Sequence, residues 1–207
     1  MRALNANLEL MREHYPPQAF YALMNLLSTH DQARSLHVLG DHGKDPAAAT
    51  LARELFRLAL FLQMTYPGSP TVYYGDEVGL NGGDDPLNRG TYPWSDLGGK
   101  PDLSMYAQFK QLIGLRNQHA VLRRGSIDAP LYLDEHVVIW LRRLGDEVAI
   151  VAVNNSAEAR VVEIALPEGS PGVWRDALTG ASVVGASGEL SLSVPGRFGS
   201  VVIGALP

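Results

Sequence analysis

The stretch Phe20-Tyr-Ala-Leu-Met-Asn-Leu-Leu27, followed directly by Ser28-Thr-His-Asp-Gln32, decides how the first half of the chain is interpreted. Nearly all of residues 20–27 are apolar, and such a run predicts a β-strand that is covered on both faces. Pro16 and Pro17 precede the run and end the helix that we expect over residues 4–13. Polar residues therefore follow the carboxyl end of a buried strand, which is where α/β proteins carry their functional loops.

Helical and strand patterns alternate over residues 1–119. Leucines on one face predict a helix over residues 46–64, and a short strand is expected over residues 71–74. A long loop rich in glycine and proline covers residues 79–102, and a second helix is expected over residues 103–117. This alternation predicts parallel strand–helix–strand packing. Two strands alone do not make a stable parallel sheet, so this α/β half is expected to be incomplete.

Residues 120–207 are rich in Val, Ile, Leu and turn residues, and they lack a long helical pattern. Strands are expected over residues 137–144 and 148–153, joined by a turn at Gly145-Asp146. Further short strands are expected near residues 160–166, 172–175, 181–184, 189–194 and 199–204. This spacing predicts an antiparallel β-sandwich, so we divide the chain into domains at residues 1–119 and 120–207.

Composition excludes several classes of protein. The chain has 207 residues, of which 46% are hydrophobic and 19% charged, so it is expected to be globular. It has no cysteine, and its six histidines lack a metal-ligand spacing, so neither metal nor cofactor is expected. A net charge of −5 argues against a nucleic-acid partner, and Arg142-Arg143 is interpreted as a solvated edge. No apolar run is long enough to span a membrane and no signal core is evident, which predicts a cytoplasmic protein.

Two pairs of polar residues are candidates for ligand binding. His30 and Asp31 follow the first strand, where they can hydrogen-bond ligand hydroxyls; alternatively, Asp31 pairs locally and His30 packs. Asp85 and Arg89 can form an ion pair that reaches a cleft and suits a polyhydroxylated ligand. Alternatively, they form an isolated surface ion pair, which contributes little to stability and indicates no function. Trp94 either stacks on a sugar or pins its own loop.

Several ordered motifs resemble one family. Met24-Asn-Leu-Leu-Ser-Thr-His-Asp31, followed by Arg34, resembles the fourth conserved region of the α-amylase family, glycoside hydrolase family 13. Residues 61–80 resemble the last helix-to-strand segment of that family's barrel. Gly82-Gly-Asp-Asp-Pro-Leu-Asn-Arg89, with Tyr92-Pro-Trp94, is most similar to the branch of neopullulanases, cyclomaltodextrinases and maltogenic amylases.

The resemblance implies that residues 1–119 supply the last two strand–helix units of a (β/α)8 barrel, followed by an all-β antiparallel sandwich. It implies that Asp31 is the third catalytic carboxylate of an α-glucan-active enzyme and favours the oxocarbenium-like transition state. His30 would contact the same sugar, while Asp85 and Arg89 would bind glucose units further along the non-reducing side. The implied substrates are α-glucans, maltooligosaccharides or cyclodextrins.

A retaining glycosidase also needs a carboxylate nucleophile and a carboxylic acid about 5 Å apart. The nearest match to the family's G-x-R-x-D nucleophile motif is Gly114-Leu-Arg-Asn-Gln118, which has Gln where Asp is required. We therefore expect a C-terminal part of such an enzyme, inactive alone, that pairs with an N-terminal complement or with itself through exposed barrel strands. The alternative is a non-catalytic carbohydrate-binding or assembly module derived from such an enzyme.

Overall fold

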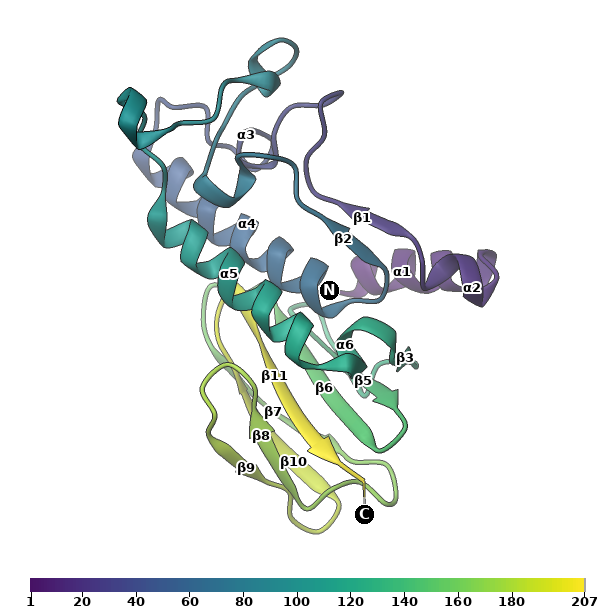
Figure 1. Cartoon of the computed structure of the whole chain (residues 1–207). Helices are drawn as coiled ribbons and strands as arrows, with labels where there is room; N and C mark the ends of the chain where they lie inside the picture. Colours follow the sequence, from purple (N-terminus) through teal and green to yellow (C-terminus); the bar gives the residue numbers. More distant parts are fainter. Residues whose placement is uncertain (207) are drawn as a thin grey trace. The chain divides into compact units, whose positions relative to one another are not determined.

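The computed structural model describes residues 1–206, shown in Figure 1, and the chain forms two compact units. Unit 1 contains residues 1–23, 65–68 and 115 onward, and unit 2 contains residues 24–64 and 69–114. Residues 1–23 therefore group with the C-terminal half of the chain. The division at residue 119 instead placed them with the α/β half. The assignment of residues 1–119 to a barrel and of the remainder to a sandwich stays a prediction.

Unit 2 is built on a pair of parallel strands. Strand β1 (Met24–Leu26) pairs in parallel with β2 (Ser69–Thr71), and helix α4 (Pro46–Thr65) lies between them in the sequence (Figure 1). The buried Gln63 of α4 joins the two strands, because its side-chain amide donates to the carbonyls of Asn25 (2.8 Å) and Thr71 (3.1 Å). The predicted parallel strand–helix–strand arrangement is therefore confirmed within this unit.

The first strand is shorter and more exposed than the sequence predicted. Helix α2 (Pro17–Phe20) occupies the start of the apolar run, because proline is well tolerated in the first turn of a helix. Met24 and Leu26 are 62% and 42% exposed, so burial on both faces was a wrong expectation. The physical reason is that β1 has only β2 as a strand neighbour among the described residues, and nothing described covers these two side chains.

The remaining elements of unit 2 are short, except for the last helix. They are α3 (Ser35–Val38) and the 3₁₀ turns η1 (Asp76–Val78), η2 (Leu87–Arg89) and η3 (Ser95–Leu97). Helix α5 (Leu103–Gln118) is capped by Asp102, the residue before it, whose carboxylate accepts hydrogen bonds from the backbone N–H groups of Ser104 and Met105. Over residues 1–206, no helix combines the length and the apolar content that crossing a membrane requires.

Unit 1 contains two antiparallel sheets. The larger has the strand order β3-β5-β6-β11-β8-β9, with β4 also on β5, and the smaller pairs β7 with β10 (Figure 1). The strands are β3 (Ser126–Ile127), β4 (Tyr132–Leu133), β5 (Val137–Leu144), β6 (Glu147–Asn154), β7 (Arg160–Ala165), β8 (Val173–Asp176), β9 (Ser182–Val184), β10 (Glu189–Val194) and β11 (Phe198–Ala205). Every strand predicted in this half is present, whereas β3, β4 and the helix α6 (Ala120–Arg124) were not anticipated.

The two sheets share one hydrophobic core. Side chains alternate between buried and exposed along β10 and over the last five residues of β7, as expected for strands with one covered face. The core contains Val137, Ile139, Leu141, Val148, Ile150, Ala152, Val162, Ile164, Trp174, Leu190, Leu192, Val194 and Val202.

Helix α1 (Arg2–His14) belongs to unit 1 through a buried polar contact. The indole N–H of Trp140 on β5 donates to the side-chain oxygen of Asn5 at 3.1 Å, and both residues are buried. The Tyr66 ring lies edge-on to Trp140, with a centroid distance of 5.8 Å. The Asn5–Trp140 bond joins the N-terminal helix to the larger sheet, in agreement with the grouping of this helix in unit 1.

Arg142 is fully buried, which corrects its interpretation as part of a solvated edge. Its guanidinium donates to the carbonyls of Ser126 (2.8 Å), Gly125 (2.8 Å) and Thr65 (2.6 Å). Burial lowers the pKa of Arg142 to about 10. The cause is its place on β5, a strand inside the larger sheet whose first six residues, 137–142, are all buried, so the Arg142 side chain must find partners within the protein.

We predict that Arg142→Met destabilises the chain by about 3 kcal/mol, because it leaves three carbonyls without their shared donor. Urea unfolding followed by circular dichroism measures the change. Arg124→Met, at an exposed arginine, is the control and should change stability by less than about 0.5 kcal/mol. Equal effects of the two substitutions would contradict a structural role for Arg142.

Candidate functional site

The loop that follows β1 carries the first pair of candidate residues. The side chains of His30 and Asp31 are 68% and 73% exposed, and His30 Nε2 lies 3.3 Å from Asp31 Oδ1. The base of the loop is fixed by Ser35, whose hydroxyl donates to the Leu27 carbonyl at 2.6 Å. Asp31 thus stands in solvent just beyond the carboxyl end of a parallel strand, where it is accessible to a ligand.

The second pair, Asp85 and Arg89, lies against this loop. Arg89 Nη2 is 3.5 Å from Asp85 Oδ2, and both side chains are about half exposed or more. Arg89 Nε donates to the His30 carbonyl at 3.0 Å, across a sequence separation of 59 residues. The structure therefore brings together all four residues that the sequence singled out.

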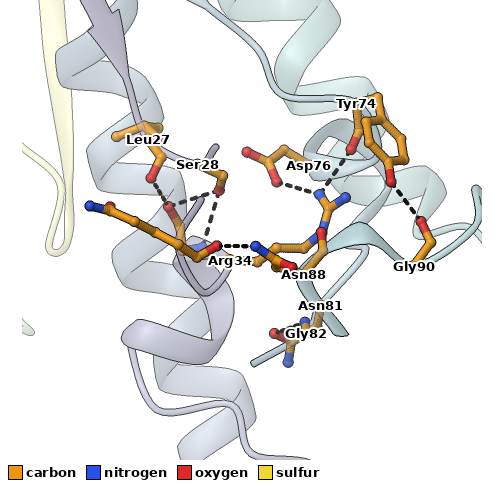
Figure 2. Close-up of polar contacts among 11 residues, drawn as sticks. Leu27, Ser28, Arg34, Tyr74, Asp76, Asn81, Gly82, Asn88 and Gly90 are labelled. Atoms are coloured by element: carbon orange, nitrogen blue, oxygen red, sulfur yellow. Dashed lines mark hydrogen bonds and ion pairs between the residues drawn. The ribbon is translucent and has the colours of Figure 1, made fainter. Parts of the chain in front are cut away.

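Arg34 is the buried centre of the site. Its guanidinium donates to the carbonyls of Asn88 (2.9 Å) and Tyr74 (2.8 Å) and to Asp76 Oδ1 (3.0 Å), as Figure 2 shows. It also lies over the rings of Tyr73 and Tyr74, at 4.4 and 4.9 Å from their centroids. One side chain therefore ties the loop after β1 to the segment after β2 and to the turn η2.

Asn88 joins the same loops from the other side. It is fully buried, and its side-chain amide donates to the carbonyls of His30 (2.8 Å) and Gln32 (3.0 Å). The backbone N–H of Arg34 donates to the Gly82 carbonyl at 3.0 Å. Sequence reasoning named Arg34 only as part of a motif and gave Asn88 no role, because an asparagine in a polar loop carries no signal of burial.

Asp76 is the ion-pair partner of Arg34 and titrates abnormally. Burial raises the pKa of Asp76 to about 6, and this effect outweighs the Ser28 hydroxyl and the Arg34 charge, which favour the carboxylate. The native state thus binds the proton more tightly than the unfolded chain does between about pH 4 and pH 6. The protonated carboxyl therefore contributes its whole share to the free energy of unfolding below about pH 4, and this share is lost as the pH rises through about 6.

The loop after η2 presents an aromatic pair. Trp94 is 56% exposed, and its ring lies 4.4 Å from that of Tyr92, centroid to centroid. The indole of Trp94 is thus exposed to solvent while its ring contacts Tyr92 within the same loop. Among residues 1–206, no three His, Asp or Glu side chains gather as a metal-binding group.

We predict that Arg34→Met lowers the free energy of unfolding by about 3–5 kcal/mol at pH 7.5, because it leaves the Asp76 carboxylate buried without its partner. The loss should be smaller at pH 5, where Asp76 is mostly protonated. Urea unfolding at both pH values measures it. The control makes the same substitution in an Asp76→Asn background, where the loss relative to Asp76→Asn alone should be equal at pH 5 and pH 7.5. A loss independent of pH when Asp76 is present would refute the pairing.

Comparison with known proteins finds a matching family model and several similar proteins. Residues 3–95 match the family model described as "Alpha amylase, catalytic domain". The chain is 36% identical to an amylopullulanase of Thermoanaerobacter thermohydrosulfuricus over 97% of its length, and 34% identical to neopullulanase 2 of Thermoactinomyces vulgaris over 92%. It is 37% identical to a cyclomaltodextrinase of Geobacillus thermopakistaniensis over 87% of its length. It spans only 14%, 31% and 29% of the length of these three relatives.

Solved structures give the same result. The α-amylase of Geobacillus thermoleovorans, solved in complex with acarbose, superposes with a TM-score of 0.80 at 27% identity, over 98% of this chain and 42% of that one. A solved cyclomaltodextrinase superposes with a TM-score of 0.74 at 28% identity, over 91% of this chain and 30% of that one. The motifs, the family model and these relatives show that the chain resembles the α-amylase family, glycoside hydrolase family 13, and is similar to its neopullulanases and cyclomaltodextrinases.

Proposed function

We propose that this chain is the C-terminal part of an α-glucan-active glycoside hydrolase. In this proposal β1, α4, β2 and α5 are the last two strand–helix units of a (β/α)8 barrel, and the two sheets of unit 1 are a C-terminal β-sandwich. The observation that carries the proposal is the exposed His30–Asp31 pair at the carboxyl end of a parallel strand, with Arg89 bonded to the His30 carbonyl. Active sites of barrel enzymes lie at that end of the strands.

The chemistry of the four side chains suits a sugar. A carboxylate such as that of Asp31 accepts hydrogen bonds and a guanidinium such as that of Arg89 donates them, so the two can bind sugar hydroxyls both as donors and as acceptors. In the proposed mechanism Asp31 binds hydroxyls of the sugar at the cleavage point and favours its oxocarbenium-like transition state. His30 contacts the same sugar, while Asp85 and Arg89 bind the glucose units further along the chain.

The nucleophile and the general acid are not part of this assignment. No G-x-R-x-D motif occurs within the 207 residues, and a retaining mechanism requires both carboxyl groups about 5 Å apart. We therefore propose that the chain by itself binds α-glucans without cleaving them. Release of reducing sugar from starch, pullulan or cyclodextrin by the highly purified chain would contradict this division of roles.

We predict that the chain binds maltotriose and that Asp31→Asn weakens the affinity about tenfold, since a hydrogen bond to a charged group contributes about 1.5–3 kcal/mol. Titration with maltotriose, followed by nuclear magnetic resonance, gives the dissociation constant. Asp84→Asn, at an exposed aspartate next to Asp85, is the matched control and should leave the affinity unchanged. Equal affinities of the Asp31→Asn variant and the unchanged chain would remove Asp31 from the site.

A second candidate function is that of a non-catalytic carbohydrate-binding or assembly module. The observation in its favour is the two-stranded parallel sheet, which has apolar side chains exposed at Met24 and Leu26. Two strands are fewer than an independent sheet needs, and a strand with an unpaired edge recruits other chains. The partner would be an N-terminal complement or a second copy of this chain.

We predict that the chain self-associates in the micromolar to millimolar range and that Met24→Lys weakens this association, because lysine on an exposed strand opposes pairing. Sedimentation velocity over that concentration range measures the effect. Val38→Lys replaces a similarly exposed apolar residue on the short helix α3 and should leave the association unchanged. A chain that stays folded and monomeric at millimolar concentration would argue against the assembly module.

A further inference from the structure

We infer that Asn88 is a positioning residue that holds Asp31 in its ligand-binding orientation. The inference rests on the proposed function, because it concerns the same sugar site. Asn88 itself is fully buried, whereas the Asp31 side chain is 73% exposed, so Asn88 acts through the backbone and not by contact with a ligand.

The geometry of the amide group is the first argument. A side-chain amide has two N–H hydrogens, and Asn88 directs them to the carbonyls of His30 (2.8 Å) and Gln32 (3.0 Å). These carbonyls belong to the residues immediately before and after Asp31. One side chain therefore restrains the backbone on both sides of the aspartate.

The weak attachment of Asp31 itself is the second argument. Its backbone N–H donates to the Thr29 hydroxyl at 3.2 Å, and its carboxylate lies 3.3 Å from His30 Nε2. Both contacts are exposed to solvent, and exposed contacts of this kind contribute little to fixing a side chain. The backbone around Asp31 is therefore held mainly by the two part-buried Asn88 bonds, with the exposed Arg89 bond to the His30 carbonyl beside them, rather than by the contacts of Asp31 itself.

The rigid mounting of Asn88 is the third argument. The backbone carbonyl of Asn88 accepts a hydrogen bond from Arg34 Nε at 2.9 Å. The 3₁₀ turn η2 holds its neighbours, with the Arg89 N–H donating to the Pro86 carbonyl at 3.1 Å. Gly82 passes so close to this turn that a Cβ there would lie 2.1 Å from the Leu87 carbonyl oxygen. Close packing fixes the turn, so its asparagine can transmit a definite position to the loop after β1.

The test compares Asn88→Asp with Asn81→Asp in the full chain. Asn81 is the matched control, because its amide also donates to a backbone carbonyl, that of Asp41 at 2.7 Å, outside residues 28–34. Each substitution keeps the size of the side chain and removes the amide donor. Asn88→Ser, which keeps one donor in a smaller side chain, is a second variant that reports on the same contact should Asn88→Asp not fold.

Two measurements are made on each variant: the backbone carbonyl carbon-13 shifts and the affinity for maltotriose. We expect Asn88→Asp to shift the His30 and Gln32 carbonyl signals and to weaken the affinity about tenfold. A tenfold change corresponds to a loss of about 1.4 kcal/mol of binding free energy. Asn88→Ser should have an intermediate effect. Asn81→Asp should shift the Asp41 carbonyl signal and leave the affinity unchanged. This holds even if its melting temperature falls as much as that of Asn88→Asp.

An unchanged affinity in Asn88→Asp, or unchanged signals at His30 and Gln32, would overturn the inference. So would an equal loss of affinity in Asn81→Asp, because it would show an effect of stability alone. If the unsubstituted chain does not bind maltotriose, the proposed function fails at that point. The carbonyl signals and the amide hydrogen exchange of Asp31 in the free protein then still decide whether Asn88 holds this loop.

Discussion

The hydrogen bonds of the buried Arg34 guanidinium hold together the segments that form the candidate site. Three segments meet at this one side chain: the loop after β1 that carries it, the segment after β2 through Tyr74 and Asp76, and the turn η2 through Asn88. Arginine suits this task because its planar group offers five donors in fixed directions and stays charged. A lysine at the same place would be a point charge and could not satisfy carbonyls from separate segments at once.

Unit 1 also contains buried arginines that each donate to several backbone carbonyls. Arg142 donates to three backbone carbonyls, and Arg116 donates to those of Tyr66, Gly68 and Leu122. Each of these arginines is buried, and burial lowers the pKa of both. Helix ends, short strands and the segments between elements leave carbonyls that need donors, and a buried arginine supplies several donors from one position.

The binding chemistry that we propose for the site separates into an exposed and a buried layer. His30, Asp31, Asp85 and Arg89 present charge and hydrogen-bonding groups to solvent, where a sugar can reach them. Beneath them lie Asn88 and the Arg34–Asp76 pair, which are buried and bonded to the backbone. Preorganisation of this kind lowers the cost of ordering side chains when a ligand binds. A loop held only by surface ion pairs would not provide it.

The sequence by itself determined the two long helices α4 and α5 and the main antiparallel strands of the C-terminal half, because periodicity and turn residues are local features. It also singled out four candidate residues that the structure finds exposed, His30, Asp31, Asp85 and Arg89. It did not determine the short extent and exposure of β1, since a local apolar run does not state how many strands flank it. Only the tertiary structure decided that residues 1–23 group with the sheets and that Arg34, Asn88 and Arg142 are buried. The physical reason is that the burial of a polar side chain depends on partners from distant segments, and these partners are set by how the chain folds back on itself.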